Sequence, residues 1–175
     1  MTRRAPVPPV FSTPIRVYYE DTDAGGVVYY ANYLKFMERA RSEWLRRLGF
    51  EQDELARDPG VLFAVRTAKL EFLKPARFND LLEATVEIRE RGRASLTFRQ
   101  QIRRDTESAN GTHQITGRAS AASRDSFSSR GPRLGHIGEV LCEGEVRVAC
   151  LEAKSFAPCP IPPTILSRLD AGAQT

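Results

Sequence analysis

Hydrophobic residues recur at spacings of three and four between about residues 31 and 48. The apolar positions in this stretch are Tyr33, Met37, Ala40, Trp44 and Leu48. This spacing places them on one face of an amphipathic helix. Two arginines in the last predicted turn and Gly49 after it are typical of a helix C-terminus. We therefore predict one long helix whose charged residues, Arg41 among them, are exposed.

Several other stretches have the alternation or the β-branched content of strands. They are the short run at 15–19 (IRVYY) and the longer runs Leu62–Leu73, Leu82–Ile88, Leu96–Ile102 and Val146–Cys150. The turn Arg91-Gly92-Arg93 is short enough to join two of these strands as an antiparallel hairpin. The order predicts an α+β fold in which one long helix packs against one largely antiparallel sheet.

Two segments lack this patterning. Residues 1–13 are rich in proline, and we predict a loose tail. Residues from about 105 to 138 are rich in Ser, Arg and Gly, a composition that predicts a disordered segment. We interpret this segment as an insertion within a single domain that spans residues 14–170. The arginines of the insertion could contact an anion or a nucleic acid, but a solvated linker is the preferred interpretation. Both histidines, His113 and His136, fall in this insertion, so catalysis elsewhere has to proceed without imidazole.

The composition is that of an ordinary globular protein. The chain has 175 residues, of which 41% are hydrophobic and 27% charged, and this is enough for one buried core. No apolar run is long enough to span a membrane and no secretory signal is evident, so we predict a cytoplasmic protein. Its three cysteines lack metal-binding spacing, and no phosphate loop or dinucleotide fingerprint occurs. We therefore expect no metal and no redox cofactor.

The stretch EDTDAGGVVYYANY, just before the predicted helix, has a different character. A helix start offers unpaired N–H groups and a partial positive charge, which can hold a developing oxyanion. Gly25 and Gly26 allow a ligand to approach the backbone, and the carboxylate of Asp23 can attack a carbonyl or activate a water. These parts suffice for acyl transfer to water. Asp and Gly are also common in turns and caps, and the residues alone favour that structural interpretation.

The segment VYYEDTDAGGVVYYANYLKFMERARSEWL resembles the opening motif of the hotdog-fold acyl-CoA thioesterases of the 4-hydroxybenzoyl-CoA thioesterase family, and especially its Tol-Pal-associated members. The similarity continues through FAVRTAKLEFLKPARFNDLLEATVEI and EGEVRVACLEAKSFAPCPIP, and covers roughly residues 14–104 and 143–169. It implies an antiparallel sheet wrapped around a long central helix. It also implies a homodimer or homotetramer with active sites at the subunit interface, and hydrolysis of acyl-CoA without a cofactor.

The resemblance assigns roles to particular residues. The catalytic carboxylate of the family falls on Asp23, as nucleophile or general base, and the N–H that polarises the thioester carbonyl falls on Tyr30. The basic positions that bind the coenzyme A phosphates fall on Arg93 and Arg147. Arg91 stands beside Arg93, but a solvated hairpin charge is an equal alternative for it.

The sequence departs from the Tol-Pal-associated members in two ways. They usually have a histidine where this chain has Tyr30, and they lack the Ser/Arg-rich insertion. The first departure keeps an alternative function in view, a hotdog protein that binds acyl-CoA or acyl carrier protein without hydrolysing it. A nucleic-acid or partner-binding module that uses the insertion is a further alternative, although we expect no nucleic-acid partner.

Overall fold

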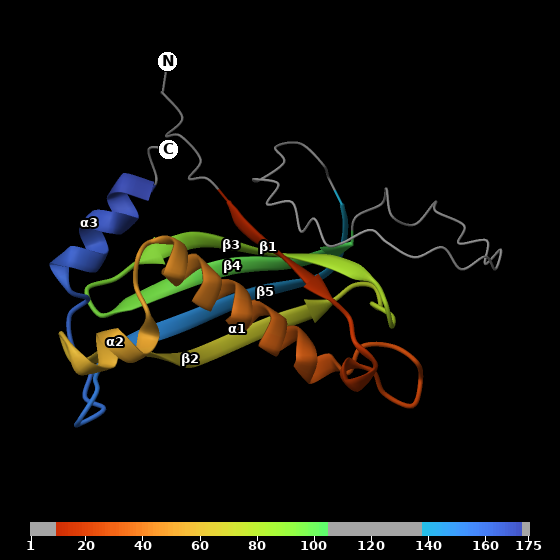
Figure 1. Cartoon of the computed structure of the whole chain (residues 1–175), viewed down its shortest axis with the longest axis horizontal. Helices are drawn as coiled ribbons and strands as arrows, with labels where there is room; N and C mark the ends of the chain where they lie inside the picture. Colours follow the sequence, from red (N-terminus) through yellow and green to blue (C-terminus); the bar gives the residue numbers. More distant parts are fainter. Residues whose placement is uncertain (1–9, 105–137, 173–175) are drawn as a thin grey trace, which may run out of the picture.

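A five-stranded antiparallel sheet forms the frame of the molecule (Figure 1). The computed structural model describes residues 10–104 and 138–172. The strands are β1 (Phe11–Arg16), β2 (Val61–Phe72), β3 (Leu81–Arg91), β4 (Ser95–Arg104) and β5 (Glu139–Glu152), in the order β1-β3-β4-β5-β2. The predicted hairpin through Gly92 joins β3 to β4. The insertion predicted at 105–138 lies almost wholly outside the described residues, as does most of the predicted tail, so both stay predictions.

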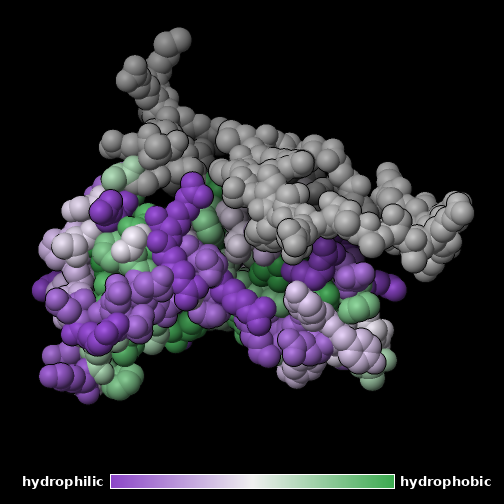
Figure 2. Space-filling model, in the orientation of Figure 1, coloured by the Kyte–Doolittle hydropathy of each residue, from purple (hydrophilic) through white to green (hydrophobic). Residues whose placement is uncertain are grey.

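One long helix, α1 (Tyr30–Arg47), packs across one face of this sheet (Figure 1). Its buried residues are Asn32, Tyr33, Phe36, Met37, Ala40 and Leu45. Apart from the polar Asn32, they form one hydrophobic core with the inward residues of the strands, such as Phe98 and Val146. The opposite side of α1 is charged, and hydrophilic residues predominate over the middle of this face of the molecule (Figure 2). The predicted α+β fold is confirmed.

Some element boundaries differ from the predictions. The first strand begins at Phe11 instead of Ile15, and residues 19–21 form a short 3-10 helix. Two helices, α2 (Gln52–Arg57) and α3 (Pro163–Gly172), were not predicted. α2 is too short to show a helical period, and the three prolines ahead of α3 obscure its start. None of the helices in the described ranges is both long and apolar enough to cross a membrane.

Arg41 is not exposed, as the sequence predicted, but partly buried between α1 and the sheet. Its guanidinium donates a hydrogen bond of 2.7 Å to Oε1 of Gln100, which is itself fully buried on β4. Burial lowers the pKa of Arg41. The amide of Gln100 in turn donates to the carbonyl oxygen of Met37, 3.0 Å away. A polar contact thus joins the middle of α1 to the sheet, in a place where periodicity indicated a solvated charge.

An ion-pair network holds the ends of β4 and β5 together. Arg104 donates to Asp80 and to Glu139, each at 2.9 Å, and to the carbonyl oxygen of Pro75 at 2.6 Å. Lys74 also contacts Glu139, at 2.5 Å. The hydrogen bond from Lys74 is the main cause that lowers the pKa of Glu139, and Arg104 adds to the effect. The network also anchors the connection between β2 and β3.

We expect Glu139→Gln to lower the free energy of unfolding in a pH-dependent way. Because folding lowers the pKa of Glu139 below its ordinary value of 4.5, its contribution is fully present above that value. The contribution is lost as the pH falls through the lowered folded-state pKa. Urea unfolding of wild type and variant should therefore differ at about pH 7 and converge at about pH 3.

The control is Glu145→Gln, since Glu145 is exposed and forms no ion pair with any described residue. This variant should unfold like the wild type at both pH values. An equal loss of stability at both pH values in Glu139→Gln would contradict the electrostatic origin.

Candidate functional site

The stretch that stood out in the sequence folds as a small closed hairpin that leads directly into α1. The Tyr29 N–H donates to the carbonyl oxygen of Asp21 and the Asp23 N–H to that of Val27, both at 2.9 Å. Gly26 closes the turn by donating to the carbonyl oxygen of Asp23 at 3.0 Å, with a φ of 73° that favours glycine. We call residues 21–29 the entry hairpin. Figure 1 shows this loop at the start of α1.

Asp23 presents an exposed carboxylate at the tip of the entry hairpin. Its Oδ1 accepts a hydrogen bond of 2.8 Å from the Gly25 N–H. A Cβ at Gly25 would lie 3.1 Å from the same oxygen, so glycine permits this close approach. The other carboxylate oxygen accepts no hydrogen bond from any described residue. Asp23 does not cap α1, because the residue at the N-cap position is Tyr29 and it makes no side-chain capping bond.

The start of α1 leaves backbone donors unpaired. The N–H groups of Tyr30 and Ala31 have no acceptor among the described residues, whereas that of Asn32 donates to the carbonyl oxygen of Tyr29 at 2.8 Å. Unpaired donors at a helix N-terminus, together with the helix dipole, attract negative charge. The donors therefore follow the carboxylate-bearing hairpin with no intervening element.

Aromatic rings line the surface beside these donors. The ring of Tyr30 lies 4.6 Å from that of Tyr29 and 6.4 Å from that of Phe72, on β2. Tyr33 lies 5.5 Å from Phe72 and continues the row into the core. Hydrogen bonding with Tyr30 raises the pKa of Tyr29. An apolar wall next to a carboxylate and two free N–H groups suits a ligand that has an apolar group attached to a carbonyl.

Buried hydrogen bonds fix the entry hairpin from below. The Tyr33 hydroxyl accepts a bond of 2.9 Å from the Ala76 N–H, and the Ala76 carbonyl accepts one of 2.8 Å from Val28. Burial raises the pKa of Tyr33. Asp21 and Asn32, both buried, supply a second connection. The sequence analysis assigned no role to Asp21 or to Asn32, since a buried contact between an amide side chain and a backbone carbonyl eleven positions away leaves no sequence pattern.

The predicted phosphate-binding arginines lie at the far end of the sheet. Arg91 forms an ion pair of 2.7 Å with Asp170 of α3, and Arg147 donates to Ser95 at 3.3 Å. Arg93 is exposed in the hairpin turn. Ser95 pairs with Ala149 at this end, whereas Phe72, beside Tyr30, pairs with Cys142.

The two groups are therefore separated along the strands. Cys142 and Ala149 lie seven positions apart on β5, which corresponds to about 20 Å at the rise of a strand. Within one chain, Asp23 and Tyr30 belong to the entry hairpin and to the start of α1 that follows it, whereas the three arginines lie at the opposite end of the sheet.

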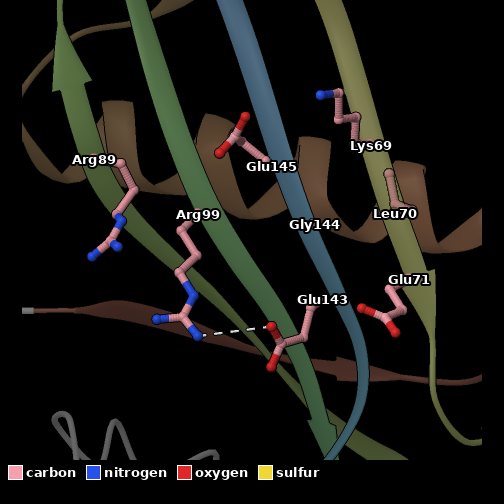
Figure 3. Close-up of a pocket in the computed structure, with 8 residues that line it drawn as sticks. All are labelled: Lys69, Leu70, Glu71, Arg89, Arg99, Glu143, Gly144 and Glu145. Carbon is pink, nitrogen blue, oxygen red and sulfur yellow. Dashed lines mark ion pairs between the residues drawn. The ribbon is translucent and has the colours of Figure 1, made fainter.

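A broad hollow of about 590 Å³ lies on the other face of the sheet, with α1 behind the strands (Figure 3). Its lining residues are Lys69, Leu70, Glu71, Arg89, Arg99, Glu143, Gly144 and Glu145. Three cationic and three anionic side chains balance, and Arg99 pairs with Glu143 at 3.7 Å. No residue predicted for the site lines this hollow, so its position does not support a role in the same chemistry.

The sheet packed on one long helix, with the entry hairpin at the helix start, defines a hotdog-fold protein. Residues 25–109 match the family model described as "Thioesterase superfamily", and the chain belongs to that family. It is 48% identical over 96 residues to the acyl-CoA thioesterase YbgC of Haemophilus influenzae, an alignment that covers 55% of this chain and 71% of that protein.

Solved structures agree with this classification. A probable thioesterase from Bartonella henselae superimposes with a TM-score of 0.66 at 28% identity, covering 88% of this chain and 100% of that one. A 4-hydroxybenzoyl-CoA thioesterase mutant in complex with 4-hydroxybenzoyl-CoA gives a TM-score of 0.71 at 13% identity, covering 91% and 98%. The second likeness shows the fold alone. The resemblance read from the sequence and the predicted hotdog fold are both confirmed.

We expect Tyr33→Phe to destabilise the protein. The change keeps the buried ring but leaves the Ala76 N–H without its acceptor, which costs about 1–3 kcal/mol. Chemical denaturation should show this as a lower free energy of unfolding. Tyr19→Phe removes a hydroxyl from a largely exposed residue and should change stability by less than about 0.5 kcal/mol. Equal stability of Tyr33→Phe and wild type would contradict the anchoring role.

Proposed function

We propose that this protein is an acyl-CoA thioesterase, which converts an acyl-CoA and water into a carboxylic acid and coenzyme A. The observation that carries the proposal is the entry hairpin. It presents the carboxylate of Asp23, one oxygen of which is unpaired among the described residues. The hairpin ends at Tyr29, and the next residue, Tyr30, has a free backbone N–H at the start of α1. The names of relatives such as the acyl-CoA thioesterase of Haemophilus influenzae support the same chemistry.

In the proposed reaction, the thioester carbonyl oxygen accepts a hydrogen bond from the Tyr30 N–H. As the carbonyl carbon is attacked, negative charge develops on this oxygen, and the donor and the helix dipole stabilise it. Removing one such donor typically raises the barrier by about 3–4 kcal/mol. The donor belongs to the backbone, so it is present whatever side chain occupies position 30, including the tyrosine of this chain.

Asp23 supplies the other half of the chemistry by one of two routes. As a nucleophile, its oxygen bonds to the carbonyl carbon, the C–S bond breaks, and water then hydrolyses the resulting anhydride. As a general base, it takes a proton from a water that attacks the same carbon directly. Either route yields the acid and the coenzyme A thiol without a metal or redox cofactor. The exposed position and the unpaired oxygen of Asp23 suit both routes.

A second subunit would complete the site. Among the described residues, β2 pairs on one side only, with β5, and exposes Val65 (54%) and Phe72 (50%) along its free edge. A long unpaired edge is a template for a further strand. Antiparallel pairing with the β2 edge of a second copy would set the Phe72 end of one chain beside the Val61 end of the other.

That pairing would bring the arginine end of one subunit to the carboxylate end of its partner. Arg93 and Arg147, with Arg91 beside them, would then bind the coenzyme A phosphates of a substrate whose thioester reaches Asp23 of the partner subunit. The 20 Å gap along one chain, about seven strand residues, is thereby accounted for by a homodimer. We propose the same dimer as the unit from which a homotetramer would be built.

We expect Asp23→Asn to abolish most turnover while leaving the fold intact. The amide can neither attack the carbonyl nor accept a proton from water, so kcat should fall by about 10²–10⁴-fold. The measurement is thiol release from a panel of aliphatic, benzoyl and 4-hydroxybenzoyl CoA thioesters. The control is Glu20→Gln, which removes an exposed carboxylate three residues away and should retain wild-type turnover.

Near-wild-type turnover in Asp23→Asn would refute the role of this carboxylate. If the wild type releases thiol from no thioester in the panel but binds acyl-CoA, the non-hydrolytic binding protein is the correct description.

Mixing two inactive variants tests the shared site. One chain carries Asp23→Asn and the other carries Arg93→Ala with Arg147→Ala. If the carboxylate and the arginines come from different subunits, each mixed dimer holds one intact site. Random reassembly after reversible unfolding should then restore about one quarter of wild-type activity, from half of the sites in half of the dimers.

If the carboxylate and the arginines served a site within one chain, every site of a mixed dimer would be defective, one without the carboxylate and the other without the arginines. The activity of the mixture would then stay at the mean of its two parents. The control partner is Arg57→Ala, because Arg57 is exposed on α2 and pairs locally with Asp53. A mixture of Asp23→Asn with this control should have about half of wild-type activity, which is the mean of its two parents, whichever subunit supplies the arginines.

A further inference from the structure

The carbonyl oxygen of Asp21 accepts two hydrogen bonds, one from the last residue of the entry hairpin and one from the first turn of α1. The Tyr29 N–H donates to it at 2.9 Å, and so does the side-chain amide Nδ2 of Asn32, also at 2.9 Å. Asp21 and Asn32 are 6% and 5% exposed, so water does not compete for this contact. One buried carbonyl therefore joins the entry hairpin to the first turn of α1.

The surroundings explain why this contact is fixed. The carboxylate of Asp21 is engaged separately and accepts a bond of 2.9 Å from the Tyr18 N–H. Within the described part of the chain, the Asn32 bond is the one hydrogen bond from a side chain of α1 to the backbone of the entry hairpin. Asp21 lies two residues before Asp23, and Asn32 lies two residues after Tyr30. The contact thus joins a residue close in sequence to Asp23 with one close in sequence to Tyr30, the two residues to which the proposed function assigns the chemistry.

We propose that Asn32 is a positioning residue that sets the distance and angle between the Asp23 carboxylate and the Tyr30 N–H. This inference rests on the proposed function, because it assigns Asn32 a part in the same reaction without contact to substrate. If the contact is lost, the first turn of α1 pivots relative to the entry hairpin, although Tyr33 still holds the helix to Ala76. A shift of about 1 Å at reacting groups can cost about 10²-fold in rate.

The test uses Asn32→Leu, which has a similar shape and no amide. We expect kcat to fall by about 10- to 100-fold with KM changed by less than about twofold, since substrate contacts are kept and only the alignment of reacting groups changes. In the same variant, the Tyr29 amide should exchange with solvent faster by hydrogen exchange, while amides in the middle of α1 keep wild-type protection.

The matched control is Gln100→Met. It likewise removes a buried amide that donates to a backbone carbonyl, here that of Met37 in the middle of α1. It should lower stability but leave kcat per folded molecule and Tyr29 exchange unchanged. Equal losses of kcat in the two variants would mean that Asn32 acts only through stability and would overturn the proposal. So would wild-type kcat and wild-type Tyr29 exchange in Asn32→Leu.

Two further measurements keep the inference testable. If Asn32→Leu does not fold, Asn32→Asp retains the shape and removes the donor, and the same losses are expected. In the wild type itself, the Asn32 side-chain amide protons should exchange slowly, and rapid exchange would refute the contact. Failure of the proposed function is distinct, since the wild type would then release no thiol whatever the variants do.

Discussion

The close packing of α1 on the sheet determines where every other part of the site lies. Met37 rests on Gly144 of β5, where a Cβ would come within 2.8 Å of the methionine sulfur. Any larger residue at that position would push the helix or its side chains outward. Above and below this contact, Phe36 and Ala40 are fully buried, so the helix has little freedom to slide or roll. The packing of these buried side chains against the sheet therefore fixes the position of the N-terminus of α1.

A rigid helix alone does not make a site, because the carboxylate belongs to a loop. The entry hairpin is exposed at its tip and is built on two glycines, features that usually give mobility. Its base is buried instead, tied to α1 through Asp21 and to the β2–β3 connection through Ala76. The hairpin can therefore leave Asp23 open to a ligand while its backbone is held from beneath. The combination of an exposed reactive tip and a buried base is what preorganised catalysis requires.

The sequence predicted the parts of this arrangement that repeat with a period or that belong to a contiguous motif. The long helix, the four longer strands and the hairpin at Gly92 follow from spacing and turn residues, and Asp23 and Tyr30 from a run of local sequence. Contacts between distant positions left no such pattern. Arg41 was misjudged because its partner, Gln100, is 59 residues away, and Asn32 was passed over because its acceptor is a backbone carbonyl, which any residue supplies.

The arrangement of charges in one chain leads to a final step of synthesis. The hydrolysis proposed for this protein would use a carboxylate and oxyanion donors at one point and cationic groups at another, separated by the length of the coenzyme A molecule. The sheet supplies this separation along its strands, with Tyr30 beside Phe72 at one end and Arg91, Arg93 and Arg147 at the other.

Within one chain, α1 and the strands lie between those two ends, so a substrate would have to run over the core. Across an antiparallel β2 edge, the same two ends come together at the surface of a pair of subunits. An interface site therefore requires no residues beyond those present. The proposed interface site would use the free edge, the exposed aromatic row and the distant arginines at once, whereas a site within one chain would leave the arginines far from the carboxylate.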